Sequence, residues 1–340
     1  MKPAIKSEKH QPSVYAFTPT QLRSYLLAHN FKPMHAGHVL AFIYRNAPLP
    51  HRLQQFIVNA CSWELPFIAQ LKVSDSDGTV KMQVELADKL AVETVIIFEK
   101  HRTTLCVSSQ VGCAQRCSFC QTGRMGLKRQ LQTHEIVAQY LLARDWLRIH
   151  NHQRTITNIV FMGMGEPLDN LDALVDAIAI LTDAHGLQLP LRKIAVSSVG
   201  NPDALRKLLG IYPNLNIAIS IHAADLAKRA KLIPAEKKWS LRASLAILQQ
   251  HGRNFLAQYT LLAGVNDSID DAKALAELLE GMEVKVNLII YNPIRNGRFT
   301  PTSIQDVQRF QDCLFKQNIR TMVRFSKGSD ISAACGQLFV

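Results

Sequence analysis

Six strand–loop–helix repeats occupy the chain from residue 103 onward, and this repetition limits the fold more than any other feature. Short apolar runs predict strands at residues 103–109, 156–162, 193–199, 216–222, 255–262 and 284–290, and residues 320–325 are a candidate seventh. Helical periodicity separates them, near residues 133–147, 170–184, 202–209, 240–250, 268–281 and 304–317. Alternating β and α units predict a parallel sheet covered by helices. We therefore expect an α/β fold, a partial (β/α)6 barrel, with a doubly wound open sheet as the alternative.

Two smaller regions precede these repeats. Residues 18–70 space their apolar side chains as helices do, for example at Leu22, Tyr25 and Leu26, and prolines separate the helical stretches. Alternating apolar residues then predict a β-hairpin. The expected regions are a helical accessory domain over 1–75 that begins with a mobile tail over 1–14, a hairpin linker over 76–102, and the partial barrel over 103–340.

Composition and charge narrow the class of protein. The chain of 340 residues is 47% hydrophobic and has no apolar run near the ~18 residues of a membrane span. Its first residues, MKPAIKSEKHQPS, lack the apolar core of a signal peptide, so we expect a cytoplasmic protein. The net charge of +12 favours an acidic partner, most commonly nucleic acid, and a basic protein without such a partner is the alternative.

Three cysteines, Cys113, Cys117 and Cys120, are spaced C-x3-C-x2-C in the loop after the first predicted strand. Thiolates this close in sequence can hold an iron–sulfur cluster. Three ligands leave one iron of a [4Fe–4S] cluster open, and the spacing is similar to the signature of the radical S-adenosylmethionine (SAM) enzymes, in which that iron binds SAM. A structural zinc loop is the alternative, but zinc sites usually show four ligands and no second cysteine pair is present.

Other chemically distinctive residues follow the ends of the predicted strands, where (β/α) barrels carry their active sites. They are the loop MGMGEP (162–167), Ser197 and Ser198, Ser220 and His222, Tyr291 and Asn292, and Cys335. A single serine or asparagine at such a place is usually a turn or cap former, but the shared placement favours one site. Gly163 and Gly165 would let a ligand approach the backbone, and Glu166 would face an ammonium group.

Eight motifs, in one order, resemble a known family. They are TLCVSSQVGC, CSFCQTG, GLKR, FMGMGEPLDN, ISIHA, GVND, NLIIYNP and DISAACGQL. Together they are similar to the radical SAM adenine methyltransferases of RNA, the RlmN/Cfr family, from about residue 75 to 338. The resemblance implies methylation of carbon 2 or carbon 8 of adenine in ribosomal RNA, transfer RNA or both. The sequence CQTG leaves the ring position open, and Ser332 stands where an acidic residue is usual.

The resemblance also assigns roles to single residues. Cys335 matches the cysteine that becomes S-methylcysteine, and Cys106 matches the partner that forms a transient disulfide with it. Glu93 matches the residue assigned as proton acceptor; apolar neighbours on its strand face would raise its pKa, and an exposed edge-strand position is the alternative. Cys113, Cys117 and Cys120 would bind the [4Fe–4S] cluster, and SAM would be bound by Gly165, Glu166, Ser197, Ser220, Ile221, His222 and Asn292.

The chemistry of the family explains why two further cysteines are needed. Carbons 2 and 8 of adenine are electrophilic, so they cannot attack the SAM methyl group. One SAM methylates Cys335, because a thiolate is a good nucleophile. A second SAM, split by an electron from the cluster, gives a 5′-deoxyadenosyl radical that takes a hydrogen atom from this methyl group. The carbon radical adds to adenine, and Cys106 then releases the methylated RNA.

Basic residues near the predicted site are candidates for phosphate contacts. They are Arg124, Lys128 and Arg129 after the cysteine loop, and Lys228, Arg229, Lys231, Lys237 and Lys238 after the fourth strand. Solvated helix faces are the alternative. The expected partners are RNA and an electron donor such as flavodoxin or ferredoxin, with no membrane.

Two other functions fit parts of the pattern. One is a radical SAM enzyme of another reaction class, in which Cys335 is structural, and the other is a non-catalytic RNA-binding iron–sulfur or zinc protein. The seven-residue spacing of Cys106 and Cys113, together with ACGQL, favours the methyltransferase over the first, and MGMGEP disfavours the second. Cys61 and Cys313 lie among helical residues and are expected in the core.

Overall fold

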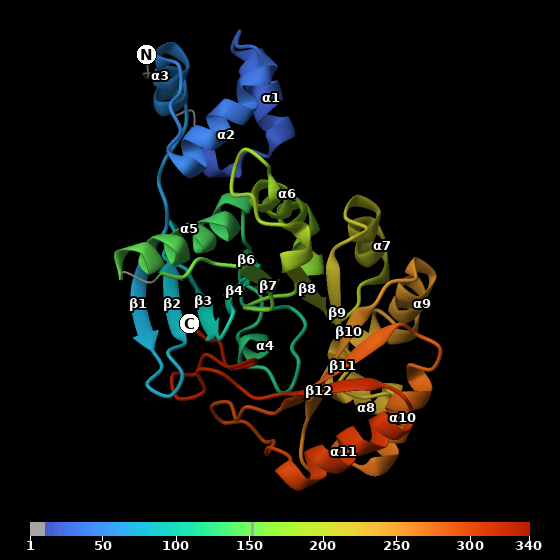
Figure 1. Ribbon diagram of the computed structural model, residues 1–340. Helices are drawn as coiled ribbons and strands as arrows, with labels where there is room; N and C mark the ends of the chain where they lie inside the picture. The colour runs from blue at the N-terminus through green and yellow to red at the C-terminus, as the bar shows by residue number, and fades with distance from the viewer. Residues whose placement is uncertain (1–10, 151–152) are drawn as a thin grey trace, which may run out of the picture.

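The computed structural model describes residues 11–150 and 153–340. Its centre is a ten-stranded sheet with the order β1-β2-β3-β4-β7-β8-β9-β10-β11-β12 (Figure 1). The strands are β1 Phe67–Val73, β2 Val80–Glu85, β3 Ala91–Glu99, β4 Arg102–Val107, β7 Asn158–Phe161, β8 Ile194–Ser198, β9 Asn216–Ser220, β10 Phe255–Leu261, β11 Val284–Ile290 and β12 Arg320–Arg324. A separate small sheet pairs β5 (Gln110–Val111) with β6 (Arg129–Gln130).

Seven strands of this sheet, β4 and β7 to β12, are parallel, and their order across the sheet is the same as their order along the chain. Right-handed crossovers in one unbroken direction put all the connecting helices on one face. They are α5 Thr133–Ile149, α6 Leu171–Thr182, α7 Pro202–Ile211, α9 Leu241–His251, α10 Ile269–Leu278 and α11 Ile304–Lys316. This order confirms the partial barrel over a doubly wound sheet, whose strand order would reverse. Within the described residues β1 and β12 are the two edge strands of the sheet and do not pair with each other, so the barrel is open.

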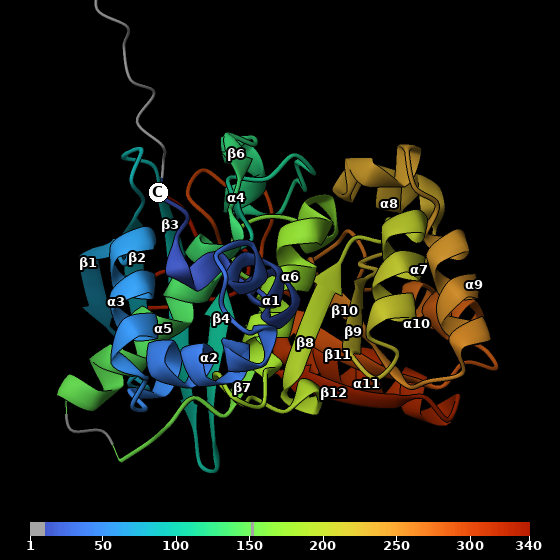
Figure 2. The ribbon, with the colours of Figure 1, turned by 90° about the horizontal axis from the view of Figure 1, so that it is seen from above.

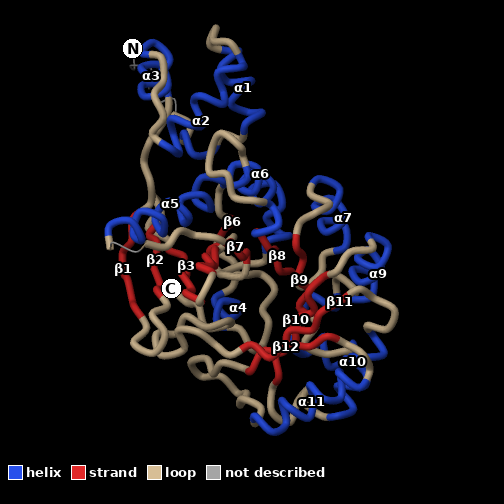
Figure 3. Tube along the Cα trace, viewed as in Figure 1, coloured by secondary structure: helices blue, strands red, loops and turns tan. Residues whose placement is uncertain are grey.

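The helices cover the convex face, and loops fill the concave face (Figure 3). Two short helices interrupt these loops, α4 (Gln121–Met125) after the cysteine loop and α8 (Leu226–Leu232) after β9, and 3-10 turns lie at Pro167–Asn170, Leu191–Lys193 and Pro234–Lys237. In Figure 2, α4 and β6 lie at the edge of the molecule at which the C-terminus also lies.

The predicted helical region near the N-terminus is present. It contains 3-10 turns Val14–Ala16 and Pro33–His35 and the helices α1 Pro19–Ala28, α2 Ala36–Arg45 and α3 His51–Ala60. Thr18 and Gln21 form a capping box that starts α1, and Leu22 and Leu26 are fully buried. Residues 1–10 of the expected tail lie outside the described residues. The expectation is wrong for residues 13 and 14, because Ser13 bridges to Ser62 and Val14 is buried.

The hairpin preceding the barrel belongs to the main sheet. β2 and β3 pair antiparallel, and β3 pairs antiparallel with β4, so the hairpin extends the parallel strands. The pattern missed β1, whose residues are almost all exposed and therefore show no alternation. Among the described residues, no helix has both the length and the apolar composition that crossing a membrane requires.

Candidate active site

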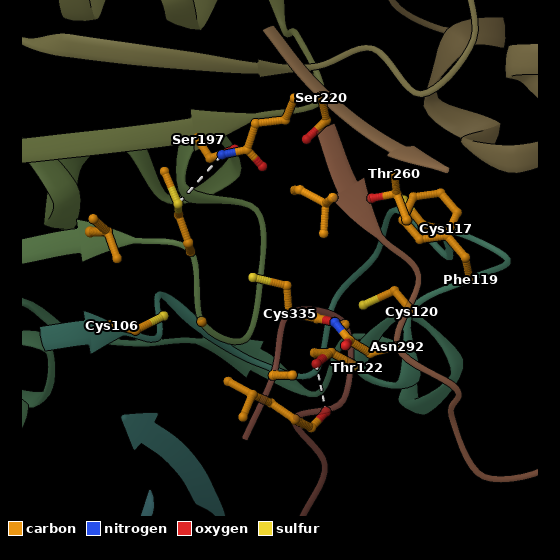
Figure 4. Close-up of a pocket in the computed structure, with 18 of the residues that line it drawn as sticks. Cys106, Cys117, Phe119, Cys120, Thr122, Ser197, Ser220, Thr260, Asn292 and Cys335 are labelled. Atoms are coloured by element: carbon orange, nitrogen blue, oxygen red, sulfur yellow. Dashed lines mark hydrogen bonds between the residues drawn. The ribbon is translucent and has the colours of Figure 1, made fainter. Parts of the chain in front are cut away.

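Most of the residues predicted to form a site line one cavity at the carboxyl ends of the parallel strands (Figure 4). The cavity lining includes Cys106, Cys113, Cys117, Cys120, Gly165, Glu166, Ser197, Ser220, His222, Asn292 and Cys335. Glu93 and Ile221 are buried but do not line this cavity. The structure therefore brings most of the residues expected at the strand ends to one cavity.

Close backbone packing fixes the cysteine loop. Gly112 has a φ of 77°, and a Cβ at this position would lie 1.8 Å from the carbonyl oxygen of Gly126. A Cβ at Gly123 would lie 2.9 Å from the amide nitrogen of Cys117. Both positions require glycine, because the loop folds tightly against its own continuation.

The three thiols of this loop suit an iron–sulfur cluster. Burial raises the pKa of each, that of Cys113 to about 12, and the neighbouring thiols raise the pKa of Cys113 and Cys117 further. Such thiols lose their protons when a positively charged metal centre binds them. Among the described residues, no three Cys, His, Asp or Glu side chains form a ready site for a single metal ion.

The glycines of MGMGEP are required by contacts within the protein. A Cβ at Gly163 would lie 2.8 Å from the backbone of Val107, and one at Gly165, where φ is 106°, would lie 2.6 Å from the Cβ of Gln110. Both glycines also line the cavity. Besides the expected room for a ligand, these glycines let the loop lie against β4 and β5.

Glu166 is a buried carboxyl that links two strand ends. It accepts hydrogen bonds from the amides of Leu168 at 3.1 Å and Val199 at 3.0 Å, which joins the loop after β7 to the end of β8. Burial raises the pKa of Glu166 to about 7. A ligand ammonium group would favour the ionised form, because an opposite charge offsets the loss of solvent.

His222 is neutral in this site. Its φ is 56°, and its Nδ1 accepts a hydrogen bond from the amide of Thr260 at 2.8 Å, so the ring proton lies on Nε2. Burial lowers the pKa of His222 to about 3. Its ring meets Phe119 of the cysteine loop edge-on, with centroids 4.8 Å apart. The end of β9 thus offers a neutral N–H donor beside the cysteine loop.

The C-terminal segment, residues 325–340, brings Cys335 to the cavity. It runs back from β12 across the concave side toward β3 (Figure 1). Asn292 donates from Nδ2 to the carbonyl of Cys335 at 3.1 Å, and the amide of Gln121 donates to the carbonyl of Gly336 at 2.7 Å. These contacts place Cys335 between the end of β11 and α4.

Cys106 and Cys335 face each other although 229 positions separate them in the sequence. In Figure 4 their sulfur atoms point toward one another across the cavity. Cys106 lies on β4 between β3 and β7, and burial raises the pKa of its thiol to about 12. Cys335 is exposed to the cavity, and both thiols are free. A merely structural Cys335 would instead be packed.

Glu93 is only 4% exposed and lies on an inner strand, so it is not an exposed edge residue. The expectation of purely apolar surroundings is wrong. Its carboxylate pairs with Lys81 at 2.8 Å and accepts a hydrogen bond from the amide of Phe339 at 2.9 Å. Glu93 therefore holds the last residues of the C-terminal segment.

Comparisons with known proteins agree with this geometry. Residues 107–279 match the model of the Radical SAM superfamily. A protein of Ruthia magnifica subsp. Calyptogena magnifica named "Dual-specificity RNA methyltransferase RlmN" is 41% identical over 268 residues, 77% of this chain and 74% of that protein. The chain belongs to the RlmN family of radical SAM enzymes.

Further matches place nearly the whole chain in the RlmN family. A protein of Akkermansia muciniphila named as a probable dual-specificity RNA methyltransferase RlmN is 35% identical over 96% of this chain and 95% of its own. A crystal structure of a radical SAM methyltransferase from Sphaerobacter thermophilus has a TM-score of 0.89 at 35% identity, covering 96% of this chain and 99% of that one. As a radical SAM protein, this enzyme uses a [4Fe–4S] cluster and SAM.

The prediction that Arg229 rims the cavity is wrong, because this residue is fully buried and does not line it. Its guanidinium donates to the carbonyls of Val199, Ser220 and Ile221 at 2.7–3.0 Å and pairs with Glu236. It thus ties together the ends of β8 and β9. The sequence contained a signal for this burial, because Arg229 is three residues from both Leu226 and Leu232 and so lies on the apolar side of α8.

Three other basic residues predicted to contact RNA already bind groups of the protein itself. Arg129 pairs with Asp88 and Glu135, Lys228 pairs with Asp271, and Arg124 donates to the carbonyls of Arg295 and Asn296. Lys128, Lys231, Lys237 and Lys238 are exposed. These four remain candidates for phosphate contacts.

Proposed function

We propose that this protein methylates a ring carbon of adenine, carbon 2 or carbon 8, in ribosomal RNA, transfer RNA or both, through S-methylcysteine at Cys335. The observation that carries the proposal is the pair of facing thiols, Cys106 and Cys335, in the cavity that also holds the three cysteines of the loop. The named relatives are RNA methyltransferases.

In this proposal Cys113, Cys117 and Cys120 would hold the cluster, which when bound would supply the electron that cleaves SAM to a radical able to take a hydrogen atom from methylated Cys335. Glu166 would face the amino group of SAM, and Ser197, Ser220, His222 and Asn292 would line its binding site. Ile221 is fully buried and lies outside the cavity lining, so its backbone and not its side chain would be available to SAM. The carboxylate of Glu166 suits an amino group, since its desolvation is otherwise uncompensated.

Cys335 acts first as a nucleophile. Its thiolate attacks the methyl carbon of SAM, the S–CH3 bond of Cys335 forms and the sulfonium bond breaks. The exposure of Cys335 in the cavity supports this step, because the attacking sulfur must reach a bound ligand. Later the same carbon bonds to the adenine ring and links protein to RNA.

Cys106 resolves this adduct. Its thiolate attacks the sulfur of Cys335, the S–S bond forms, the S–CH2 bond breaks, and the electron pair passes to the carbon, which takes a proton. The hydrogen on the ring carbon leaves as a proton, and the resemblance gives Glu93 the role of acceptor. The unpaired electron that the radical addition leaves on the adduct must pass to a one-electron acceptor, a role that the oxidised cluster would supply when bound. A two-electron thiol reductant returns the disulfide to two thiols.

The partners and compartment follow from the same chemistry. The exposed lysines Lys128, Lys231, Lys237 and Lys238 would contact RNA phosphates, and an electron donor of the flavodoxin or ferredoxin kind would reduce the cluster. All seven cysteines are free, which suits a reducing compartment, and we place the enzyme in the cytoplasm.

The direct test is mass spectrometry of nucleosides from ribosomal and transfer RNA of cells with and without the gene. We expect 2-methyladenosine or 8-methyladenosine to disappear with the gene, and the one that disappears identifies the ring position. Identical nucleosides in both strains would contradict the proposal.

A further inference from the structure

The C-terminal segment has little of its own to hold it in place. Residues 325–340 form no helix or strand. Its buried apolar side chains are few, and two of the three are small, namely Ala333, Ala334 and Leu338. Burying alanine contributes little, because the transfer free energy scales with apolar area. The position of Cys335 must therefore depend on hydrogen bonds made by its neighbours.

Many of these hydrogen bonds come from the turn between β1 and β2, residues 74–79. The carboxylate of Asp330 accepts from the hydroxyl of Ser74 at 2.8 Å and the amide of Asp75 at 3.1 Å. In return the amide of Gly328 donates to the carboxylate of Asp77 at 3.0 Å. The hydrogen bond from Ser74 lowers the pKa of Asp330. Burial acts to raise the pKa of Asp77, but hydrogen bonds from Thr79 and Gly328 lower it overall, so both carboxylates are ionised at neutral pH.

The fit is steric as well as polar. Gly328 has a φ of 63°, and a Cβ there would lie 2.8 Å from the Cγ2 of Thr79. Only glycine allows the C-terminal segment to approach the turn this closely. The turn and the segment therefore match in shape and in hydrogen bonding.

Lys81, at the start of β2, adds a contact nearer to the catalytic cysteine. It is 7% exposed, and its Nζ donates to the carbonyl of Ser332 at 3.1 Å while it pairs with Glu93 at 2.8 Å. Ser332 precedes Cys335 by three residues and has a φ of 54°. The buried Lys81 thus connects Glu93, the proposed proton acceptor, to the segment that carries Cys335.

We propose that the turn 74–79 and Lys81 form a clasp that positions Cys335 opposite Cys106. Through this clasp the antiparallel hairpin takes part in the proposed reaction. Asp330 and Lys81 are positioning residues that act through Cys335. The inference rests on the proposed function of Cys335. The clasp raises the effective concentration of one thiol at the other, as any tether of fixed length does.

The test uses the full-length, cluster-loaded protein under anaerobic conditions and needs no RNA. Diamide is added, and the disulfide between Cys106 and Cys335 is followed by mass spectrometry of peptides. Asp330→Ala should slow its formation about fivefold, because hydrogen bonds to a charged group are lost. Ser329→Ala is the matched control, since this neighbouring serine is exposed, and it should leave the rate unchanged.

A second pair of variants and a second measurement separate positioning from loss of structure. Lys81→Met should slow the disulfide and Lys81→Arg should restore it, because arginine keeps the cation. Iodoacetamide should label Cys335 about fivefold faster in Asp330→Ala, with labelling of buried Cys106 unchanged. Unchanged labelling of Cys335, or equally faster labelling of both cysteines, overturns the clasp.

The two proposals fail in distinguishable ways. No disulfide in the unmodified protein would count against Cys106 as the resolving thiol, and the labelling of Cys335 would still decide on the clasp. An equal disulfide rate in Asp330→Ala and the unmodified protein would overturn the clasp and leave the proposed function intact.

Discussion

The two sides of the cavity are held in different ways. On the side of β8 and β9, the buried side chains of Arg229 and Glu166 bind the backbone where the strands end. On the other side, Cys335 lies in a segment without helix or strand, and single hydrogen bonds from several elements hold it, some at the exposed Asp330 and some from the buried Lys81 and Asn292. The difference suits the proposed reaction, in which SAM keeps one place and Cys335 meets SAM, adenine and Cys106 in turn.

The largest effect on stability is expected from Arg229→Met. Removing one partner of a buried ion pair costs about 3–5 kcal/mol, because Glu236 is left unpaired and three carbonyls lose their donor. Denaturant unfolding of the cluster-free protein measures it, with Lys231→Met on the exposed side of α8 as the control. If both variants lost the same small amount, the strand ends would not depend on Arg229.

A smaller effect, dependent on pH, is expected from Glu166→Gln. The pKa of Glu166 is raised from 4.5 to about 7 by burial, so its contribution to stability is present below pH 4.5 and is lost as pH rises through 7. Glutamine has no such proton. Between pH 5 and 8 the variant should therefore gain about 2–3 kcal/mol relative to the unmodified protein. A difference independent of pH would show that the carboxyl is not desolvated.

The smallest effect on stability is expected on the other side of the cavity. Asp330→Ala should leave the midpoint of thermal unfolding unchanged, because its bonds lie at the surface and join a segment without helix or strand. Differential scanning calorimetry of the variant and of Ser329→Ala checks it. A large drop for Asp330→Ala alone would remove the contrast between the two sides.

The repeated pattern and the cysteine spacing allowed the barrel and the cysteine loop to be predicted. Both depend on local sequence, since strand and helix periodicities and ligand spacing are properties of neighbouring residues. The same holds for the strand-end residues that meet in the cavity, because parallel strands bring their carboxyl ends to one edge.

Three features could not be predicted from the sequence, because they depend on pairing between strands and on burial. Lys81 and Glu93 are diagonal neighbours across β2 and β3, because Gln83 is the direct partner of Glu93, and such a contact appears only once the register is known. β1 was missed because an exposed edge strand has no buried face to impose alternation. Arg229 was read as a surface charge because a charge is rarely fully buried unless paired.

The central claim is that Cys335 carries the methyl group and that Cys106 releases the RNA. The most direct measurement uses Cys106→Ala expressed in cells and run on a denaturing gel. We predict a band of raised mass that RNase removes, because the adduct forms but is not resolved. The band should be absent from Cys106→Ala/Cys335→Ala and from Cys313→Ala, a control on α11. Normal RNA methylation by Cys106→Ala without any adduct would contradict the account.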